Sequence, residues 1–131
     1  MRVVLCNGCF DLLHIGHLRH LEEARDMGDS LVVGLTLDEG IGKLGRPIIP
    51  DRERIELLRG LRCVSSAFYC RDSLDALRSA RPDIFCKGAD YLEKGLLEEE
   101  IAHCRLHGIE IRHTKPNPQT TSAIIERIKC G

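Results

Sequence analysis

The stretch Leu5-Cys-Asn-Gly-Cys-Phe-Asp-Leu-Leu-His-Ile-Gly-His17 lies just inside the N-terminus of this 131-residue chain, and the rest of the fold is organised around it. An apolar run, Val3 to Leu5, leads into it and predicts a short buried strand. Asn7-Gly8 is typical of a turn, and a helical pattern follows from Leu12 onward. Strand, glycine turn and helix in this order place the turn at the carboxyl end of a strand, where open parallel sheets bind ligands.

Two histidines stand three residues apart at the start of the predicted helix. Positions i and i+3 lie on the same side of a helix, so the imidazoles of His14 and His17 can face one point. A helix N-terminus has unpaired N–H groups and a partial positive charge, which together attract an anion. Gly16 removes a side chain that would obstruct a phosphate, and Gly8 lets the backbone approach closely. The pattern predicts a pocket for a phosphate that gains charge in a transition state.

Composition restricts the class of protein. Hydrophobic residues make up 43% of the chain and charged residues 30%, which is typical of a soluble globular protein, and the length predicts a single domain over residues 1–131. A net charge of −1 gives no reason to expect nucleic acid or an anionic membrane as a partner. No apolar run reaches the ~20 residues of a membrane span and no signal-peptide pattern opens the chain, so we expect a cytoplasmic protein.

Seven cysteines occur at irregular spacings, which favours reduced thiols over a disulfide framework. One alternative is a zinc site, because Cys6-x-x-Cys9 followed by His14-x-x-His17 supplies two thiolates and two imidazoles. Structural zinc sites usually separate their ligand pairs by a longer loop, and Cys6 falls within the predicted strand. We therefore assign no metal ligands. The remaining cysteines are interpreted as small apolar filler, namely Cys63, Cys70, Cys86, Cys104 and Cys130.

Hydrophobic periodicity predicts strands and helices that alternate along the whole chain. The strands are expected at 3–5, 31–36, 64–70, 84–86 and 109–111, and the helices at 12–27, 51–59, 73–79, 96–107 and 123–129. Gly28 is expected to end the first helix, Asp51 to cap the second, and Asp72 or Ser73 to cap the third. This order of elements predicts a doubly wound α/β fold with right-handed crossovers.

The segment Gly8-Cys-Phe-Asp-Leu-Leu-His14-Ile-Gly-His17 resembles the G-x-F-D-x-x-H-x-G-H signature of the cytidylyltransferase-like nucleotidyltransferases. Within that superfamily, Asn7 to Asp11 resembles the heptose 1-phosphate adenylyltransferases. The length and the start of the chain are similar to those of glycerol-3-phosphate cytidylyltransferase. The resemblance runs from Val3 to about Ile128. It implies a five-stranded parallel sheet in the order 3-2-1-4-5, helices on both of its faces, and a homodimer.

A loop rich in glycine and proline, residues 37–50, carries the cations Lys43 and Arg46 and is a candidate lid over a phosphate. Relatives have a lysine in this loop before an Arg-Pro, as Lys43 precedes Arg46-Pro47 here. Arg54 matches the arginine of the family pattern R-P-x-x-P-x-x-x-R. Ordinary solvated surface charges are the alternative reading of all three residues.

Two later segments also match the family. Lys87-Gly-Ala-Asp-Tyr91 resembles the K-G-G-D-Y of heptose adenylyltransferases, with Ala89 in place of glycine. The resemblance implies that the backbone of this segment lies near the base of the nucleotide. Tyr91 is expected to pack either against a ligand or in the core. The hydroxyl-bearing residues 120–122 resemble the S-T-T of the family, which implies that they bind the β- and γ-phosphates of the nucleotide. The alternative is that these hydroxyls only cap the last helix. Lys115 stands where cytidylyltransferases have arginine, which leaves the choice of nucleotide open.

The resemblance implies nucleotidyl transfer, in which an acceptor phosphate attacks the α-phosphorus of a nucleoside triphosphate and pyrophosphate leaves. Mg²⁺ is expected to arrive with the triphosphate. The implied catalytic residues are His14, His17 and Lys43. The implied nucleotide-binding residues are Gly8, Cys9, Phe10, His14, Gly16, His17, Lys87, Gly88, Asp90, Lys115, Thr120, Thr121 and Ser122. The implied acceptor-side residues are Lys43, Arg46, Arg54 and Asp11, although Asp11 is better suited to ordering its turn.

The resemblance implies a few possible pairs of nucleotide and phosphate acceptor. ATP with a sugar 1-phosphate such as a heptose 1-phosphate is favoured, and CTP with glycerol 3-phosphate is the main alternative. FMN adenylyl transfer is a more distant one, and a module that binds nucleotide without turnover belongs to a different functional class. The kinase domain often fused to heptose adenylyltransferases is not in this sequence, so a separate chain is expected to supply that activity.

Overall fold

The computed structural model describes residues 1–42 and 45–131, and its strands and helices alternate as the sequence predicts. The strands are β1 (Val3–Gly8), β2 (Ser30–Thr36), β3 (Ser66–Cys70), β4 (Ile84–Lys87) and β5 (Glu110–His113). The helices are α1 (Ile15–Arg25), α2 (Asp51–Arg59), α3 (Ser73–Ala80), α4 (Tyr91–Lys94), α5 (Glu98–His107) and α6 (Thr121–Cys130), together with a short 3₁₀ turn, η1 (Asp38–Gly40).

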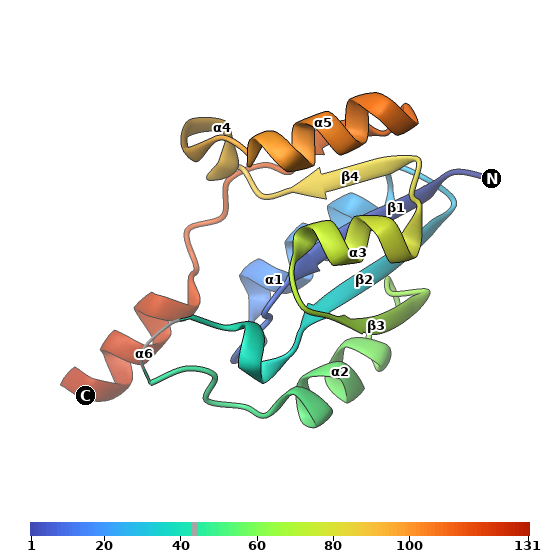
Figure 1. Cartoon of the computed structure of the whole chain (residues 1–131). Helices are drawn as coiled ribbons and strands as arrows, with labels where there is room; N and C mark the ends of the chain where they lie inside the picture. Colours follow the sequence, from blue (N-terminus) through green and yellow to red (C-terminus); the bar gives the residue numbers. More distant parts are fainter. Residues whose placement is uncertain (43–44) are drawn as a thin grey trace.

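The five strands form one parallel sheet in the order β3-β2-β1-β4-β5 (Figure 1). This confirms the predicted fold class and strand order. The chain adds β2 and β3 on one side of β1 and then crosses to add β4 and β5 on the other, so the direction of winding reverses between β1 and β4. Cys6 at the centre of β1 is paired in register with Val33 on β2 and with Cys86 on β4.

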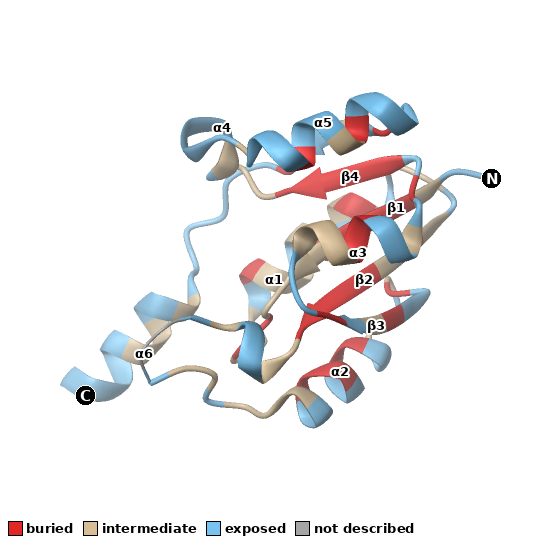
Figure 2. Cartoon of the chain, viewed as in Figure 1, coloured by how far each residue is buried: buried red, intermediate tan, exposed pale blue. Residues whose placement is uncertain are grey.

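Helices cover both faces of this sheet, as predicted (Figure 1). On one face, Leu21 of α1 and Ile55 of α2 join the buried side chains of β1 and β2. On the other face, Leu77 of α3 and Cys104 of α5 pack with Phe85 and the rest of a second core cluster. Because both faces are covered, the central strands are buried almost throughout, and this explains their continuous apolar sequences (Figure 2).

Helix α6 differs from the other long helices because none of its residues is buried (Figure 2). It lies beyond the carboxyl ends of the strands and is reached by an extended segment that leaves β5 (Figure 1). Its attachment to the domain therefore depends on contacts at its N-terminal end. No helix among the described residues is both long and apolar enough to span a membrane.

The first strand is longer than predicted, because Asn7-Gly8 does not interrupt it. Asn7 pairs with Gly34 and Gly8 with Leu35 of β2, and the Asn7 side-chain amide donates to the Gly34 carbonyl oxygen at 3.0 Å. The change of direction comes later, where Phe10 takes a positive φ of 49°. Pairing with a neighbouring strand has here overridden a local turn preference.

Other element boundaries also move. Pro50, not Asp51, is the N-cap of α2, because the Asp51 carboxylate instead accepts a hydrogen bond from the Asp38 N–H at 3.0 Å. Helix α1 ends at Arg25, before the predicted stop at Gly28, and β3 begins at Ser66 rather than Val64.

The remaining caps and breaks follow local chemistry. Asp72 caps α3 as predicted, since its carboxylate accepts from the Asp75 N–H at 2.8 Å. The helix predicted over 96–107 begins at Glu98, and a separate short helix, α4, precedes it. Gly95 ends α4 at a φ of +75°, a backbone conformation that favours glycine.

Candidate active site

A cleft of about 730 Å³ opens at the carboxyl ends of β1 and β4. This is where the strand order reverses, which is the position at which open α/β sheets bind ligands. Its walls come from the loop after β1, the start of α1, the loop after β4 and the segment between β5 and α6. The predicted nucleotide-binding residues that line it are Gly8, Cys9, Phe10, His14, Gly16, His17, Gly88, Asp90, Lys115, Thr120 and Thr121.

The imidazoles of His14 and His17 stack face to face in this cleft, with ring centroids 3.9 Å apart and an interplanar angle of 27°. His14 is the N-cap of α1, and its Nδ1 accepts a hydrogen bond from the Gly16 N–H at 3.0 Å. Nδ1 of His17 accepts from the His14 N–H at 3.3 Å. Because both Nδ1 atoms are acceptors, each neutral ring carries its proton on Nε2. The pair therefore presents two N–H donors.

A hydrogen-bonded chain ties α6 to this histidine pair. Nε2 of His14 lies 3.2 Å from the Thr121 hydroxyl, which in turn donates to the Asp11 carbonyl oxygen at 3.1 Å. The Thr120 hydroxyl caps the helix by accepting from the Ala123 N–H at 3.0 Å. Of the predicted hydroxyl trio, Thr120 and Thr121 face the cleft, whereas Ser122 is exposed outside it.

Burial lowers the pKa of both stacked histidines. For His17 it combines with the nearby imidazoles of His14 and His20 to bring the pKa to about 4, and for His14 burial alone is the cause. Both rings are therefore neutral at pH 7 in the unliganded protein. Among the described residues, none accepts a hydrogen bond from Nε2 of His17, so this donor is open to the cleft.

The glycine of the histidine motif is needed by the protein's own packing. A Cβ on Gly16 would lie 2.6 Å from the Gln119 carbonyl oxygen and 2.8 Å from the His14 ring. The atoms that require glycine here thus belong to the α6 connection and to His14. Gly8 is in a milder position, because its Cβ would lie 3.1 Å from the Phe10 ring.

Asp11 is fully buried and orders the turn after β1. Its carboxylate accepts from the N–H groups of Ile48 and Ile49, at 2.8 and 2.9 Å, and from Arg46 Nε at 2.7 Å. Burial alone would raise the pKa of Asp11, but these hydrogen bonds and the Arg46 charge outweigh it and lower the pKa. Neither Asp11 nor Arg46 lines the cleft, so their predicted acceptor-side roles have no support from their positions.

Arg54 is buried too, so its reading as an exposed helix charge is wrong. Its guanidinium donates to the carbonyl oxygens of Cys9, Thr36 and Ile49 and forms an ion pair with Asp38. These partners belong to the loop after β1, the end of β2 with the following η1 turn, and the segment that leads into α2. Arg54 therefore holds three segments together from behind the cleft and is not placed to contact a substrate in it.

Of the predicted site lysines Lys43 and Lys87, the structure describes the second. Lys43 lies outside the described residues. The side chain of Lys87 is 7% exposed, with its Nζ 3.8 Å from Glu100 Oε2 and 4.1 Å from the centroid of the Tyr91 ring. It is therefore turned toward α5 rather than into the cleft, whose lining at this point comes from Gly88, Asp90 and Tyr91.

Several cleft residues were not predicted, and His20 is the most informative of them. Its Nδ1 lies 2.6 Å from the Thr114 hydroxyl, and both residues line the cleft. The sequence does contain a signal for His20, because it follows His17 by three residues and so continues the same helical face. No local pattern marks Thr114 or Gln119, which arrive from beyond β5.

The zinc site that the sequence offered as an alternative has the wrong set of ligands. Cys6, Cys9, His14 and His17 do not converge, and Nδ1 of each histidine is occupied by a backbone N–H. In the described part of the chain, Cys6 is instead close to His20 of α1 and Cys86 of β4. All seven cysteines are free thiols, as predicted.

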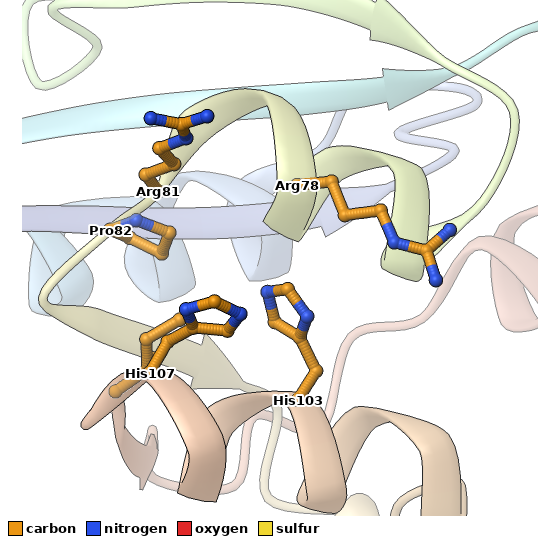
Figure 3. A pocket seen from close by; sticks show the side chains of 6 residues that line it. Arg78, Arg81, Pro82, His103 and His107 are labelled. Carbon is orange, nitrogen blue, oxygen red and sulfur yellow. The ribbon is translucent and has the colours of Figure 1, made fainter.

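A second hollow, of about 620 Å³, lies between α3 and α5 (Figure 3). It is lined by Arg78, Arg81, Pro82, His103, His107 and Ile109. Pro82 and Ile109 stand just before β4 and β5, so this hollow is at the amino ends of the strands, opposite the cleft. It contains none of the residues of the N-terminal motif.

The parallel sheet, the winding reversal and the histidine-lined cleft define a doubly wound α/β protein with a cleft at its switch point. The chain belongs to the cytidylyltransferase-like family, whose sequence model matches residues 5–127.

The sequences of individual proteins are also similar to this chain. The chain is 41% identical over 133 residues to the bifunctional protein HldE of Helicobacter pylori (strain HPAG1), a match covering 98% of this chain and 28% of that protein. It is 39% identical to HldE of Citrifermentans bemidjiense, with 97% and 27% covered. The chain thus spans a little over a quarter of the length of these relatives.

A crystal structure of the lipopolysaccharide core biosynthesis protein from Thermoplasma volcanium GSS1 is also similar. It has a TM-score of 0.74 and 30% sequence identity, and the match covers 89% of this chain and 98% of that one.

Proposed function

We propose that this chain transfers a nucleoside monophosphate from a nucleoside triphosphate to a phosphorylated sugar, releasing pyrophosphate, with ATP and a sugar 1-phosphate such as a heptose 1-phosphate as substrates. The stacked pair of His14 and His17 in the cleft is the observation that carries this proposal. The similarity to HldE and to a lipopolysaccharide core biosynthesis protein supports a sugar phosphate as the acceptor.

The proposed reaction needs positioning and charge stabilisation more than proton transfer. An oxygen of the acceptor phosphate forms a bond to the α-phosphorus, and the bond from that phosphorus to the β-phosphate oxygen breaks. The acceptor phosphate is already ionised, so no general base is required. His17 donates from Nε2 to an oxygen on the α-phosphorus, and His14 exchanges its contact with Thr121 for one with the same triphosphate.

The β- and γ-phosphates are assigned to the N-terminus of α6. This ten-residue helix presents free N–H groups beside Thr120 and Thr121 at the edge of the cleft. Lys115 lines the same wall and supplies a cation. Binding there would also fix α6, which has no buried residue of its own.

Mg²⁺ bound to the triphosphate would neutralise part of its charge. The carboxylates available to it are Asp90 and Glu93, which line the cleft. Asp11 is unsuited to this role, because both of its oxygens are occupied by Ile48, Ile49 and Arg46. A homodimer and a cytoplasmic location stay predictions from the sequence.

The test is pyrophosphate release measured with ATP, CTP, GTP and UTP, each with Mg²⁺ and in turn with heptose 1-phosphate, glycerol 3-phosphate and FMN. We expect release with ATP and the sugar 1-phosphate. Release only with CTP and glycerol 3-phosphate, or only with ATP and FMN, would replace our substrates with an alternative pair. A thermal shift of the same samples measures binding separately, since ligand at 100 times Kd stabilises by about 2.7 kcal/mol. Nucleotide binding without release for any pair would overturn the catalytic proposal.

A further inference from the structure

Three side chains with soft or borderline metal-binding atoms converge beside the cleft. They are Cys6 on β1, Cys86 on β4 and His20 on α1, and one ligand atom from each lies within 4.8 Å of the other two. Cys6 and Cys86 are register partners on adjacent strands, and both belong to the core cluster on the face that α1 covers. The three residues thus meet between the sheet and the helix that lies over it.

We propose that Cys6, Cys86 and His20 bind one zinc-class cation through two thiolates and one imidazole. Zinc in proteins takes sulfur at about 2.3 Å and nitrogen at about 2.0 Å, so the ligand atoms of a tetrahedral site lie about 3.5–3.8 Å apart. The three ligand atoms observed here lie within 4.8 Å of one another, which is an upper bound on their separations. The strands already hold the two cysteines in register, and the proposed cation would draw the three ligand atoms to these distances.

The surroundings of His20 match those of a metal ligand. Histidines that bind metals commonly donate their second ring N–H to an oxygen atom, which fixes the tautomer and the ring orientation. Nδ1 of His20 lies 2.6 Å from the hydroxyl of Thr114, and Thr114 is itself buried. With its proton on Nδ1, the ring has a free lone pair on Nε2 for a cation.

Packing alone does not account for this combination of residues. A small apolar side chain would fill the positions of Cys6 and Cys86 equally well, and Cys104 occupies such a position on the opposite face of the sheet. The half-buried imidazole of His20 stands where these two buried thiols meet the cleft, and three such ligand atoms together suit a thiophilic cation.

Three protein ligands leave one tetrahedral position for water or another molecule. The cleft could supply that ligand, since His20 and Thr114 line it while Cys6 and Cys86 are buried. This composition is that of open rather than closed zinc sites. The proposed cation is distinct from the Mg²⁺ that accompanies a triphosphate, because thiolates are poor ligands for Mg²⁺.

The experiment uses the full chain, reduced, stripped with a chelator, and then titrated with Co²⁺ and afterwards with Zn²⁺. We expect one Co²⁺ per chain, a thiolate-to-cobalt charge-transfer band, the strong visible bands of tetrahedral cobalt, and loss of both when Zn²⁺ displaces it. Cys6→Ser and Cys86→Ser should each weaken the charge-transfer band, and His20→Gln should keep it but lower the affinity. A ligand change is expected to cost at least the roughly 10–100-fold lost with an outer-shell partner.

Matched variants separate a metal site from general damage to the core. Cys104→Ser, buried on the other face, and Cys130→Ser, exposed on α6, should both bind Co²⁺ like the unmodified chain. Thr114→Val tests the site without touching a ligand and should lower the affinity about 10–100-fold with the charge-transfer band retained. A cobalt spectrum without the thiolate band, or equal loss of metal in Cys104→Ser, would overturn the proposal. These readouts do not involve nucleotidyl transfer, so neither result bears on the proposed function.

Discussion

Asp11 and His17 lie six residues apart in the same motif, and the fold uses them in opposite ways. The Asp11 side chain has no exposed surface, and its two oxygens accept three hydrogen bonds. His17 has one nitrogen engaged by the backbone and leaves the other facing an open cleft. Asp11 is saturated by the protein, whereas His17 is not.

The comparison divides the motif into a scaffold and a working surface. A buried charge must be paired, because leaving it unpaired is costly, so Asp11 and Arg54 are surrounded by partners. A group that acts on a ligand must keep a donor free until the ligand arrives, as His17 does. Substitutions in the scaffold should therefore be detected in the free energy of unfolding, and those on the working surface in the turnover rate.

The largest effect is expected for Arg54→Met. It leaves three carbonyl oxygens without this donor, and each buried acceptor left unsatisfied costs about 1–3 kcal/mol, so the three together cost about 3 kcal/mol or more. Asp38 adds little to this loss, because its side chain is 40% exposed and water can replace the guanidinium. Urea unfolding should show a loss of this size. The control is Arg52→Met, whose side chain is 77% exposed and should change stability little. Equal losses of unfolding free energy in the two variants would show that Arg54 has no special part in the scaffold.

His17→Ala should cost about 0.5–2 kcal/mol of stability, because it removes the acceptor of the His14 N–H at the start of α1. It should raise the reaction barrier by about 2.7–4 kcal/mol, a fall of about 100–1000-fold in kcat, as for the loss of one oxyanion donor. The measurement is pyrophosphate release at saturating nucleotide. His107→Ala, in the hollow at the opposite end of the sheet, is the control and should keep full turnover. If His17→Ala turned over normally, the working surface would have to be sought elsewhere in the cleft.

Gly16→Ala tests the boundary between the two parts. The added Cβ would meet the Gln119 carbonyl oxygen at 2.6 Å and the His14 ring at 2.8 Å, so it should separate α6 from the histidine pair. Overpacking of this kind costs about 1–3 kcal/mol of stability, and we expect nucleotide affinity to fall as well. At Gly60 the nearest atom lies at 3.4 Å, an ordinary contact, so Gly60→Ala should be tolerated. Urea unfolding curves measure the stability of the two variants, and nucleotide titrations measure their affinity. Equal stability and equal affinity in the two variants would contradict the prediction.

Acid should separate scaffold and working surface by the pH at which each loses stability. Burial lowers the pKa of His17 from an ordinary 6.5 to about 4, so the unfolded chain binds the extra proton first and stability falls as pH drops through that interval. His14 and His20 act in the same direction. The lowered pKa of Asp11 matters only below its ordinary value of 3.8. Urea unfolding of His17→Gln should therefore show a shallower loss between pH 6.5 and 4 than the unmodified chain, and parallel curves would contradict this.

The elements and the histidine pair were predictable because their signals are local. Apolar runs mark the strands, and the spacing of His14 and His17 places their rings together without reference to any other segment. The strand order came from the family resemblance and not from periodicity. Arg54 was matched to a family position, yet its burial was not foreseen, since nothing in its own helix shows that the carbonyl oxygens of Cys9 and Thr36 come to meet it.

The sequence by itself determined the order of the elements, the class of fold and the presence of a paired-histidine motif after the first strand. Only the tertiary structure decided which polar groups are saturated and which stay free. Thr121 reaches His14 from 107 residues away, and Cys86 reaches Cys6 from an adjacent strand that is far along the chain. Hydrogen bonds and ligand sets of this kind depend on how distant segments pack, and no local pattern of residues encodes that packing.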